Sequence, residues 1–292
     1  MRIVSLVAVL TLACSFLHAE TPGLKRELER SYAAWRNALV AQDFAGWQQT
    51  TAAHRQMAIR NLIVSQKQAF PHALFSLPMR PPETATLRYL AISERGNTAQ
   101  LAYFGKVDIG VADASEIPES LLFLKFVRES TGWKFDTTRM VSLASTPEIS
   151  AALKNGGGPT FMDAPEFALS GEVPAIAKPC PMPDRIGVLQ IGSFGYTTKA
   201  TVNGFDVATV QDNAEEHLVI GGLYNGNNKL ELMVKQTTIP ADAERSLEIH
   251  ALVLTGNQEK PTYRVFSWKA EVHPVPEQVK LNIVANKSTM RD

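Results

Sequence analysis

The feature that most constrains this chain is a change in the spacing of its apolar residues near Pro82. Before that point apolar residues recur at three- and four-residue multiples, as in Leu24, Leu28, Trp35 and Leu39, which is the spacing of one helix face. Beyond it they alternate with polar residues, as in β-strands. Prolines around the change stop the helical pattern, because proline lacks an amide hydrogen. The spacing predicts helices first and antiparallel strands afterwards.

The helices and the first strands form one predicted domain, at about residues 22–150. Asp43 is a plausible N-cap for a second helix, and a third helical stretch follows. The alternating runs start at residues 84–93 and end with 133–143. Helices followed by an antiparallel meander indicate an α+β domain.

The break in the helical pattern at 41–47 (AQDFAGW) and the hairpin of 124–129 and 132–136 resemble the nuclear transport factor 2-like (SnoaL-like) superfamily. This resemblance implies a cone-like domain, with helices packed in a curved antiparallel sheet and a cavity at its open end. Members of the superfamily include isomerases, cyclases and dehydratases as well as non-enzymatic binding domains. The resemblance therefore does not select a function.

A second domain is predicted after a Gly/Pro-rich hinge and linker at 151–183, where a Gly triplet ends at Pro159. The β-sandwich domain spans 184–285 and a polar tail 286–292. The prediction of a sandwich is based on seven short runs in which apolar and polar residues alternate, separated by turns. These runs lie at 186–191, 197–202, 217–220, 230–234, 247–254, 263–268 and 279–284. The stretch Gly192–Gly195 is interpreted as a turn between the first two runs.

Two turn motifs of this domain carry a second resemblance. Asn203-Gly204 ends one run, and Gly226 to Leu232 (GNNKLEL) begins another. The arrangement is similar to galactose-binding-like accessory β-sandwiches of carbohydrate-active enzymes. That resemblance implies a glycan ligand.

The N-terminus is predicted to direct export. Residues 1–19 carry one charge, Arg2, followed by an apolar run at 3–13, as in a signal peptide. The protein is then periplasmic or secreted. The alternative is a lipid anchor through Cys14, whose preceding residues resemble a lipoprotein box. No later apolar segment reaches the roughly 20 residues that a transmembrane helix needs.

The charge balance narrows the possible partners. The 292-residue chain has 29 Lys and Arg against 29 Asp and Glu, a formal net charge of zero. Nucleic-acid binding is not expected, because phosphate recognition needs an excess of basic side chains. A small molecule, a glycan or an envelope protein stays possible as a partner, and the sequence does not indicate an oligomeric state.

Metal and cofactor motifs are not found. His54, His72, His217, His250 and His273 show no metal-ligand spacing. Cys180 lies between two prolines without a basic activator nearby in sequence, so we interpret it as an inert surface cysteine. No metal or cofactor is predicted.

The choice of candidate site residues depends on the cone-like domain that the resemblance implies. Tyr89, Tyr103, Trp133 and Arg139 are predicted to line its cavity and bind a ligand. Strict alternation on the last strand puts Trp133 and Arg139 on one face and Asp136 on the other. One of Asp136 or Arg139 would then point into the cavity. Asp136 is a candidate acid–base catalyst beside a tyrosine donor, or else a solvent-facing carboxylate in an ion pair.

Three functions are consistent with these observations. The first is a non-enzymatic binding or envelope-associated protein, with its ligand in the cavity of the first domain. The second is a small isomerase, cyclase or hydratase that uses a cavity carboxylate. The third is a carbohydrate-binding accessory protein that stacks sugars on exposed aromatic residues of the sandwich. The candidates for that platform are Tyr196, Phe205, Tyr224 and Trp268.

Overall fold

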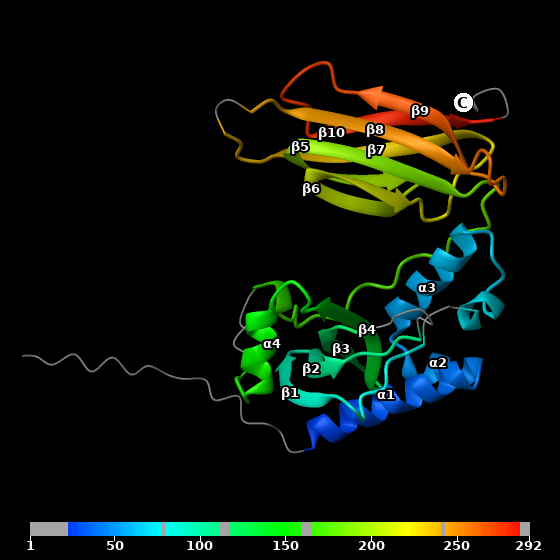
Figure 1. Ribbon diagram of the computed structural model, residues 1–292. Coiled ribbons are helices and arrows are strands. Elements are labelled where there is room, and N and C mark those ends of the chain that lie inside the picture. The colour runs from blue at the N-terminus through cyan, green and yellow to red at the C-terminus, as the bar shows by residue number, and fades with distance from the viewer. Residues whose placement is uncertain (1–22, 77–79, 111–116, 159–164, 241–242, 287–292) are drawn as a thin grey trace, which may run out of the picture. The chain divides into compact units, whose positions relative to one another are not determined.

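The computed structural model of the chain describes residues 23–76, 80–110, 117–158, 165–240 and 243–286 (Figure 1). The chain divides into two compact units. The first is drawn from Met1–Trp35, Pro82–Asp108 and Ala114–Val173, and the second from Arg36–Pro81, Ile109–Asp113 and Pro174–Asp292. The predicted signal peptide and Cys14 lie outside the described residues. Among the helices described, none is long and apolar enough to cross a membrane.

The first unit is built on an antiparallel meander of four strands in the order β1-β2-β3-β4. Gly96 and Gly132 turn the chain at the two tight hairpins with positive φ, which glycine adopts without steric cost. The strands are β1 (Arg88–Arg95), β2 (Thr98–Lys106), β3 (Glu119–Glu129) and β4 (Gly132–Ser142).

Helical segments contact both faces of this sheet. On one face α1 (Leu24–Val40) packs aromatic side chains on β4, with the Trp35 and Phe135 ring centroids 4.0 Å apart. On the other face α4 (Pro147–Lys154) and the short helix η3 (Pro165–Phe167) complete an apolar cluster, in which the Phe123 and Phe167 rings stack at 4.8 Å. The boundary between the two units falls inside α1.

The other helices belong to the second unit. These are α2 (Phe44–Thr50), α3 (Ala53–Ser65) and the short helix η1 (His72–Phe75). Asp43 caps α2 as predicted, since its carboxylate accepts a hydrogen bond of 3.0 Å from the amide of Gly46.

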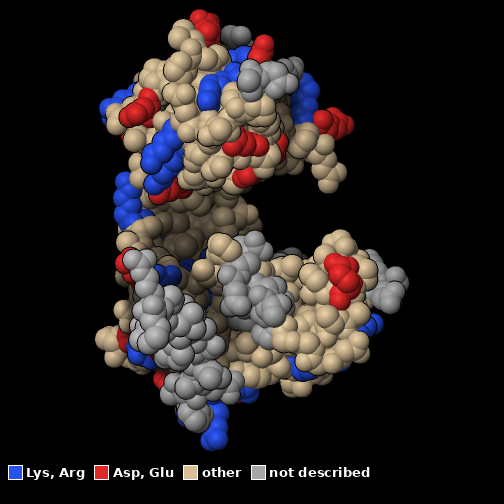
Figure 2. Space-filling model, turned by 90° about the vertical axis from the view of Figure 1, so that its left-hand side faces the viewer, with Lys and Arg blue, Asp and Glu red and all other residues tan. Residues whose placement is uncertain are grey.

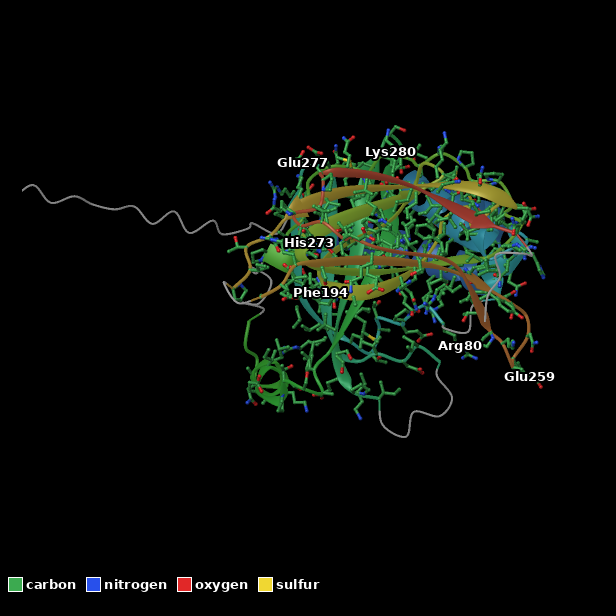
Figure 3. The ribbon with its side chains drawn as sticks, turned by 90° about the horizontal axis from the view of Figure 1, so that it is seen from above. Arg80, Phe194, Glu259, His273, Glu277 and Lys280 are labelled. Atoms are coloured by element: carbon green, nitrogen blue, oxygen red, sulfur yellow. The ribbon has the colours of Figure 1, made fainter. Side chains whose placement is uncertain are left out.

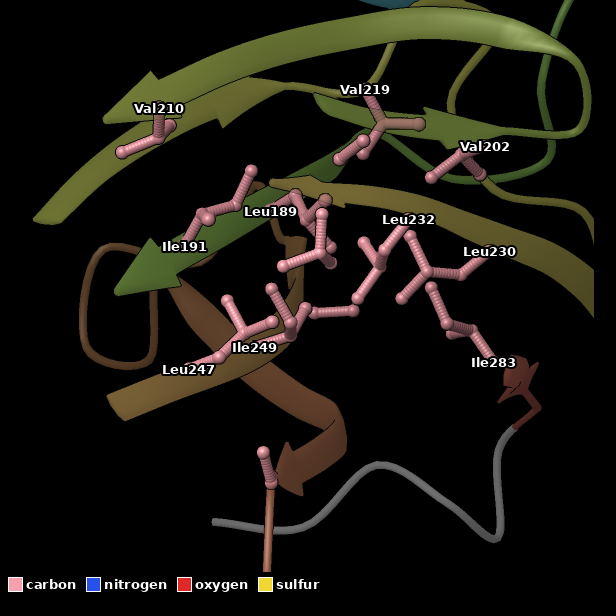
Figure 4. Packing of buried hydrophobic residues seen from close by; sticks show 14 of the residues in the cluster. Leu189, Ile191, Val202, Val210, Val219, Leu230, Leu232, Leu247, Ile249 and Ile283 are labelled. Atoms are coloured by element: carbon pink, nitrogen blue, oxygen red, sulfur yellow. The ribbon is translucent and has the colours of Figure 1, made fainter. Parts of the chain in front are cut away.

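A single six-stranded antiparallel sheet forms most of the second unit. Its path runs β10-β7-β5-β8-β9, and β6 pairs with β5. The inward side chains make one apolar core, which Figure 4 shows from close by. The strands are β5 (Gly187–Val202), β6 (Phe205–Leu218), β7 (Gly226–Gln236), β8 (Ser246–Leu254), β9 (Thr262–Lys269) and β10 (Gln278–Ala285).

A bulge in β5 gives this sheet its curvature. The register against β6 shifts between Ser193 and Thr197, and Gly195 takes a φ of 74°. The Asp212 carboxylate accepts hydrogen bonds from the Gly195 amide (2.8 Å) and the Thr237 hydroxyl (2.9 Å). Before the bulge β5 pairs with β8, and after it with β7. The sheet therefore curls until it is nearly a barrel.

The predicted fold class, a cone-like α+β domain followed by a sandwich, is wrong. Helices make up 21% and strands 44% of the structure, so the chain is mainly β. The cone is not observed, because α2 and α3 lie in the other unit and α4 covers the second face of the meander. The second unit has one curled sheet, whereas the prediction was two sheets packed as a sandwich. Periodicity shows which side chains share a face, but it does not show what that face packs against.

The predicted linker at 151–183 is shared between the units. Its described part before Pro174 follows the first sheet, where Gly171 accepts a hydrogen bond from the Asn97 amide (2.8 Å). The part after Pro174 follows the second unit, where Asn61 of α3 bonds to the backbone of Lys178 (2.9 Å). The chain therefore passes from one unit to the other at 173–174.

Candidate functional site

The structure brings two of the predicted ligand-binding residues together. Tyr89 and Tyr103 are cross-strand partners on β1 and β2, with ring centroids 6.0 Å apart and edge to face. The Tyr103 hydroxyl donates to the carboxylate of Glu29 (3.0 Å), which also forms an ion pair with Lys25 (2.7 Å). Burial and the neighbouring Glu29 carboxylate raise the pKa of Tyr103. Its phenol is therefore a stable hydrogen-bond donor that joins α1 to the sheet.

The other two predicted residues lie on opposite faces of β4. Trp133 is buried on the α1 side, where its carbonyl accepts a hydrogen bond from the Ser31 hydroxyl (3.0 Å). Arg139 is exposed on the other side, with its guanidinium 4.7 Å from the ring centroid of Phe167. The prediction that Trp133 and Arg139 share one face is wrong.

A bulge at Asp136 explains this error. Lys125 of β3 pairs with Thr137, while the next residue, Phe126, pairs with Phe135. Asp136 is therefore the extra residue of β4, and every side chain after it changes face. Asp136 itself is half-buried. Its catalytic role stays a prediction, and neither of the hollows described below includes it.

The prediction that Cys180 lies on the surface is wrong, because the residue is buried. Its side chain is 1% exposed, with its sulfur 3.9 Å from the Ser65 hydroxyl of α3. The side chain of Asn61 accepts from the Cys180 amide (2.9 Å) and donates to the Lys178 carbonyl (2.9 Å), as a neighbouring strand would. Ser65 in turn accepts from the Gly221 amide (2.7 Å). This cluster joins α3 to the large sheet and is structural.

The predicted aromatic platform of the second unit is not exposed. Tyr196 is fully buried, and its hydroxyl hydrogen-bonds to His273 Nδ1 (3.0 Å). Phe205, Tyr224 and Trp268 are half-buried. The exposed aromatic residue is instead Phe194, at 45% exposure, which Figure 3 locates on the strand-rich unit.

Phe194 borders a hollow of about 400 Å³ on the outer face of β5, β6 and β8, which we call the acidic hollow. Gly192 lies at its centre, paired with Ala214 on one side and Glu248 on the other. The absence of a side chain at Gly192 leaves the space open, since only two atoms would lie within 4 Å of a Cβ there. The lining residues are Gln190, Ile191, Gly192, Phe194, Ala214, Glu215, Glu216, Glu248 and His250.

The charges of the lining all have one sign, apart from the histidine. Glu216 and Glu248 contribute carboxylates, and no Lys or Arg lines the hollow. Glu215 also borders the hollow, but it pairs with the inward-facing Ile191 and directs its side chain to the other face of β6. On the face that Figure 2 shows, acidic and basic side chains intermingle. The nearest base in the strand register is Lys269 of β9, opposite Glu248, and no ion pair joins the two. The acidic hollow is therefore a local negative region on a chain that is neutral overall.

The carboxylates of Glu216 and Glu248 each already contact one uncharged or weakly basic donor. Glu216 accepts from the Gln190 amide, and Glu248 lies 3.0 Å from His250 Nε2. Glu215, on the other face of β6, accepts from the Asn213 side chain (3.1 Å) and lies 2.8 Å from Nε2 of His217. These contacts hold the carboxylates in position and leave further acceptor capacity, because an ionised carboxylate has about four lone-pair sites. His250 Nδ1 is buried without a hydrogen-bond partner in the structure described.

A second hollow of about 440 Å³ lies near the β5 bulge. Arg245 lines it and stacks over Tyr196, with its guanidinium 5.3 Å from the ring centroid. The same guanidinium donates to the carbonyls of Gly195 and Thr237. Arg245 therefore closes the bulge, and its donors are directed at the backbone rather than at a ligand.

Among the described residues, no group of three or more His, Cys, Asp or Glu side chains is arranged to hold a metal ion. Comparison with known proteins adds no relative: no family model, no curated protein and no solved structure matches this chain. The two family resemblances stay predictions, apart from the cone fold corrected above.

Sequence reasoning missed the acidic hollow because it divided β5 into two strands. The runs before and after Gly192–Gly195 are parts of one 16-residue strand. Continuous alternation from Leu189 to Ser193 puts Gln190, Gly192 and Phe194 together on the outer face. The signal available in the sequence was Gly192, a glycine with Gln190 and Phe194 two positions away on either side and therefore on the same face.

Proposed function

We propose that this is an exported, non-catalytic binding protein whose ligand site is the acidic hollow, and that the ligand carries an ammonium or guanidinium group. The observation that carries the proposal is the joint presence of two carboxylates, Glu216 and Glu248, and the exposed ring of Phe194 around an open space. Carboxylates bind such cations by charge-assisted hydrogen bonds. An aromatic face attracts them through its quadrupole.

Three observations favour a cation ligand in the acidic hollow over the two alternative functions. Its carboxylates are spread over β6 and β8 on an open sheet face, whereas acid–base catalysis needs an enclosed site that excludes water. The enzyme alternative required a cone-shaped cavity in the first unit, and that cone is not observed. The carbohydrate alternative required a stacking platform whose four predicted residues are buried or half-buried.

Calorimetric titration of the full chain with spermidine, a small polycation, tests the proposal. Binding is expected at low ionic strength and weakens as salt is added, because exposed charges are screened beyond about 10 Å at 0.1 M salt. Phe194→Ala is expected to weaken binding about fivefold to tenfold through loss of the cation–π contact. Its control is Met233→Ala, which truncates another exposed apolar side chain, on β7.

Filling the hollow gives a second and independent variant. Gly192→Val fits the strand, since the nearest atoms to a new Cβ are 3.9 and 4.0 Å away. It is expected to weaken spermidine binding at least tenfold and leave the melting temperature unchanged. Thr209→Val, at an exposed position of β6 beyond the lining, is the matched control. Equal affinity in Gly192→Val and Thr209→Val, or binding of a neutral oligosaccharide in place of spermidine, would contradict the proposal.

A further inference from the structure

The strand β6 has one unpaired edge. It pairs with β5 along nearly its whole length, and among the described residues no strand pairs with its other side. Figure 1 shows β6 at the border of the large sheet. A 14-residue edge strand presents a row of backbone donors and acceptors to which another strand can add.

The ladder geometry identifies the backbone groups at this edge. Val219 donates to the Gly187 carbonyl (2.8 Å), one position beyond the register pair of Val188 and Leu218. Hydrogen-bonded and non-bonded pairs alternate in an antiparallel ladder. Residues 214, 216 and 218 therefore direct their backbone groups away from β5. The Ala214 amide is satisfied locally by the Asn213 side chain (2.8 Å), so the free amides are those of Glu216 and Leu218.

The same segment borders the acidic hollow. Ala214, Glu215 and Glu216 of β6 belong to its lining. Since side chains opposite each other in neighbouring strands share a face, a residue that pairs with Glu216 would put its side chain beside the hollow. The residues of an added strand on either side of it would face Glu215 and His217 on the inner side of β6.

The charge of β6 selects the partner. Between Phe205 and Leu218 the strand carries four acidic residues and no Lys or Arg. Two copies of β6 would put like charges opposite each other, which destabilises strand pairing. A strand that carries Lys or Arg would instead bring opposite charges together.

We propose that the free edge of β6 adds an extended, basic segment of a partner protein as a further strand, with an alternating Lys or Arg side chain reaching the acidic hollow. This inference rests on the proposed function and names its ligand class. The backbone supplies pairing that is independent of sequence, and the carboxylates select basic side chains. The exposed ring of Phe194 contacts the part of the basic side chain that crosses the hollow.

Fluorescence anisotropy with three labelled peptides tests this inference on the full chain. The first peptide alternates Lys and Thr over about eight residues, a usual strand length. The second has the same sequence with N-methyl groups on consecutive amides, which retain the charge but block strand pairing along both edges of the peptide. The third replaces Lys with Glu. The expected order is tight binding of the first peptide, at least tenfold weaker binding of the second, and no binding of the third.

A charge variant locates the contact. Glu216→Gln is expected to weaken binding of the Lys–Thr peptide about threefold to tenfold, as for one exposed charge pair strengthened by a neighbouring ring. Glu231→Gln, at an exposed position on β7 outside the hollow, is expected to bind like the parent chain. Equal effects of the two changes would place the peptide elsewhere and overturn the inference.

The outcomes separate this inference from the proposed function. Equal binding of the first two peptides, with competition by spermidine, would show a cation site without strand addition. The inference would then fail and the proposed function would stand. No binding of either peptide or of spermidine would overturn both. Self-association of the protein without peptide, reversed by salt, would identify a second copy as the occupant through its basic strand β9 and also overturn the inference.

Discussion

Polar side chains of two kinds can be distinguished in this protein, by whether they satisfy buried backbone groups or lie on an exposed sheet face. Asn61, Ser65 and Asp212 satisfy buried backbone groups, and each joins segments that are distant in sequence. Glu216 and Glu248 accept hydrogen bonds from side chains on the outer sheet face and keep acceptor capacity for a ligand. Burial decides between the two, because an unsatisfied polar group inside a protein costs free energy that an exposed group does not.

Removing the Asn61 side chain tests whether polar side chains of the first kind stabilise the fold. Asn61→Ala leaves the Cys180 amide and the Lys178 carbonyl without their partners, and is expected to lower the free energy of unfolding by about 2–3 kcal/mol. Urea denaturation measures the change. Asn37→Ala, at an exposed position of α1, is the control and is expected to change stability by less than about 0.5 kcal/mol. Equal stability of the two variants would show that the Asn61 contacts do not hold α3 to the sheet.

At the scale of elements, local patterns were predicted well and packing partners were not. The first helix, the Asp43 cap and the β1–β4 meander follow from spacing and turn residues, which are local properties. The bulge at Asp136 shifts the alternation on which the predicted faces of β4 depended, and the bulge at Gly195 lies where the sequence indicated a turn. Packing of α3 against the segment around Cys180 connects residues more than 100 positions apart, and no local pattern contains that information.

The attachment of α4 to β3 depends on one carboxylate. Glu119 forms an ion pair with Lys154 (2.8 Å) and accepts a hydrogen bond from Ser150. These two contacts lower the pKa of Glu119 below its usual value of 4.5. A carboxyl group whose pKa is lowered by folding stabilises the protein above its unfolded pKa, and this contribution is lost as the pH falls through the folded value.

We therefore expect Glu119→Gln to lower the melting temperature at pH 7, with the difference from the parent chain disappearing as the pH falls below about 4.5. Thermal unfolding followed by circular dichroism at several pH values measures this difference. Glu172→Gln, an exposed residue of the same unit, is the control. A difference that persists unchanged at pH 3 would show that the charge of Glu119 does not stabilise the attachment.

The molecule as a whole consists of two units whose segments interleave along the chain. The first unit takes residues from both sides of the α2–α3 region, and that region joins the large sheet of the second unit. The ligand was predicted in the first unit because the family resemblance implied a cavity there. The geometry favours the second unit, where the β5 bulge and Gly192 open a hollow among carboxylates.

Hydrogen–deuterium exchange of the full chain, with and without the Lys–Thr peptide, tests the location of the ligand site most directly. Slower exchange is expected for the amides at 213–218 in β6 and for those of the hollow at 187–194 and 246–250. No change is expected around Tyr89 and Tyr103. Protection confined to the first sheet, or binding of the peptide without protection of β6 and the hollow, would contradict the account.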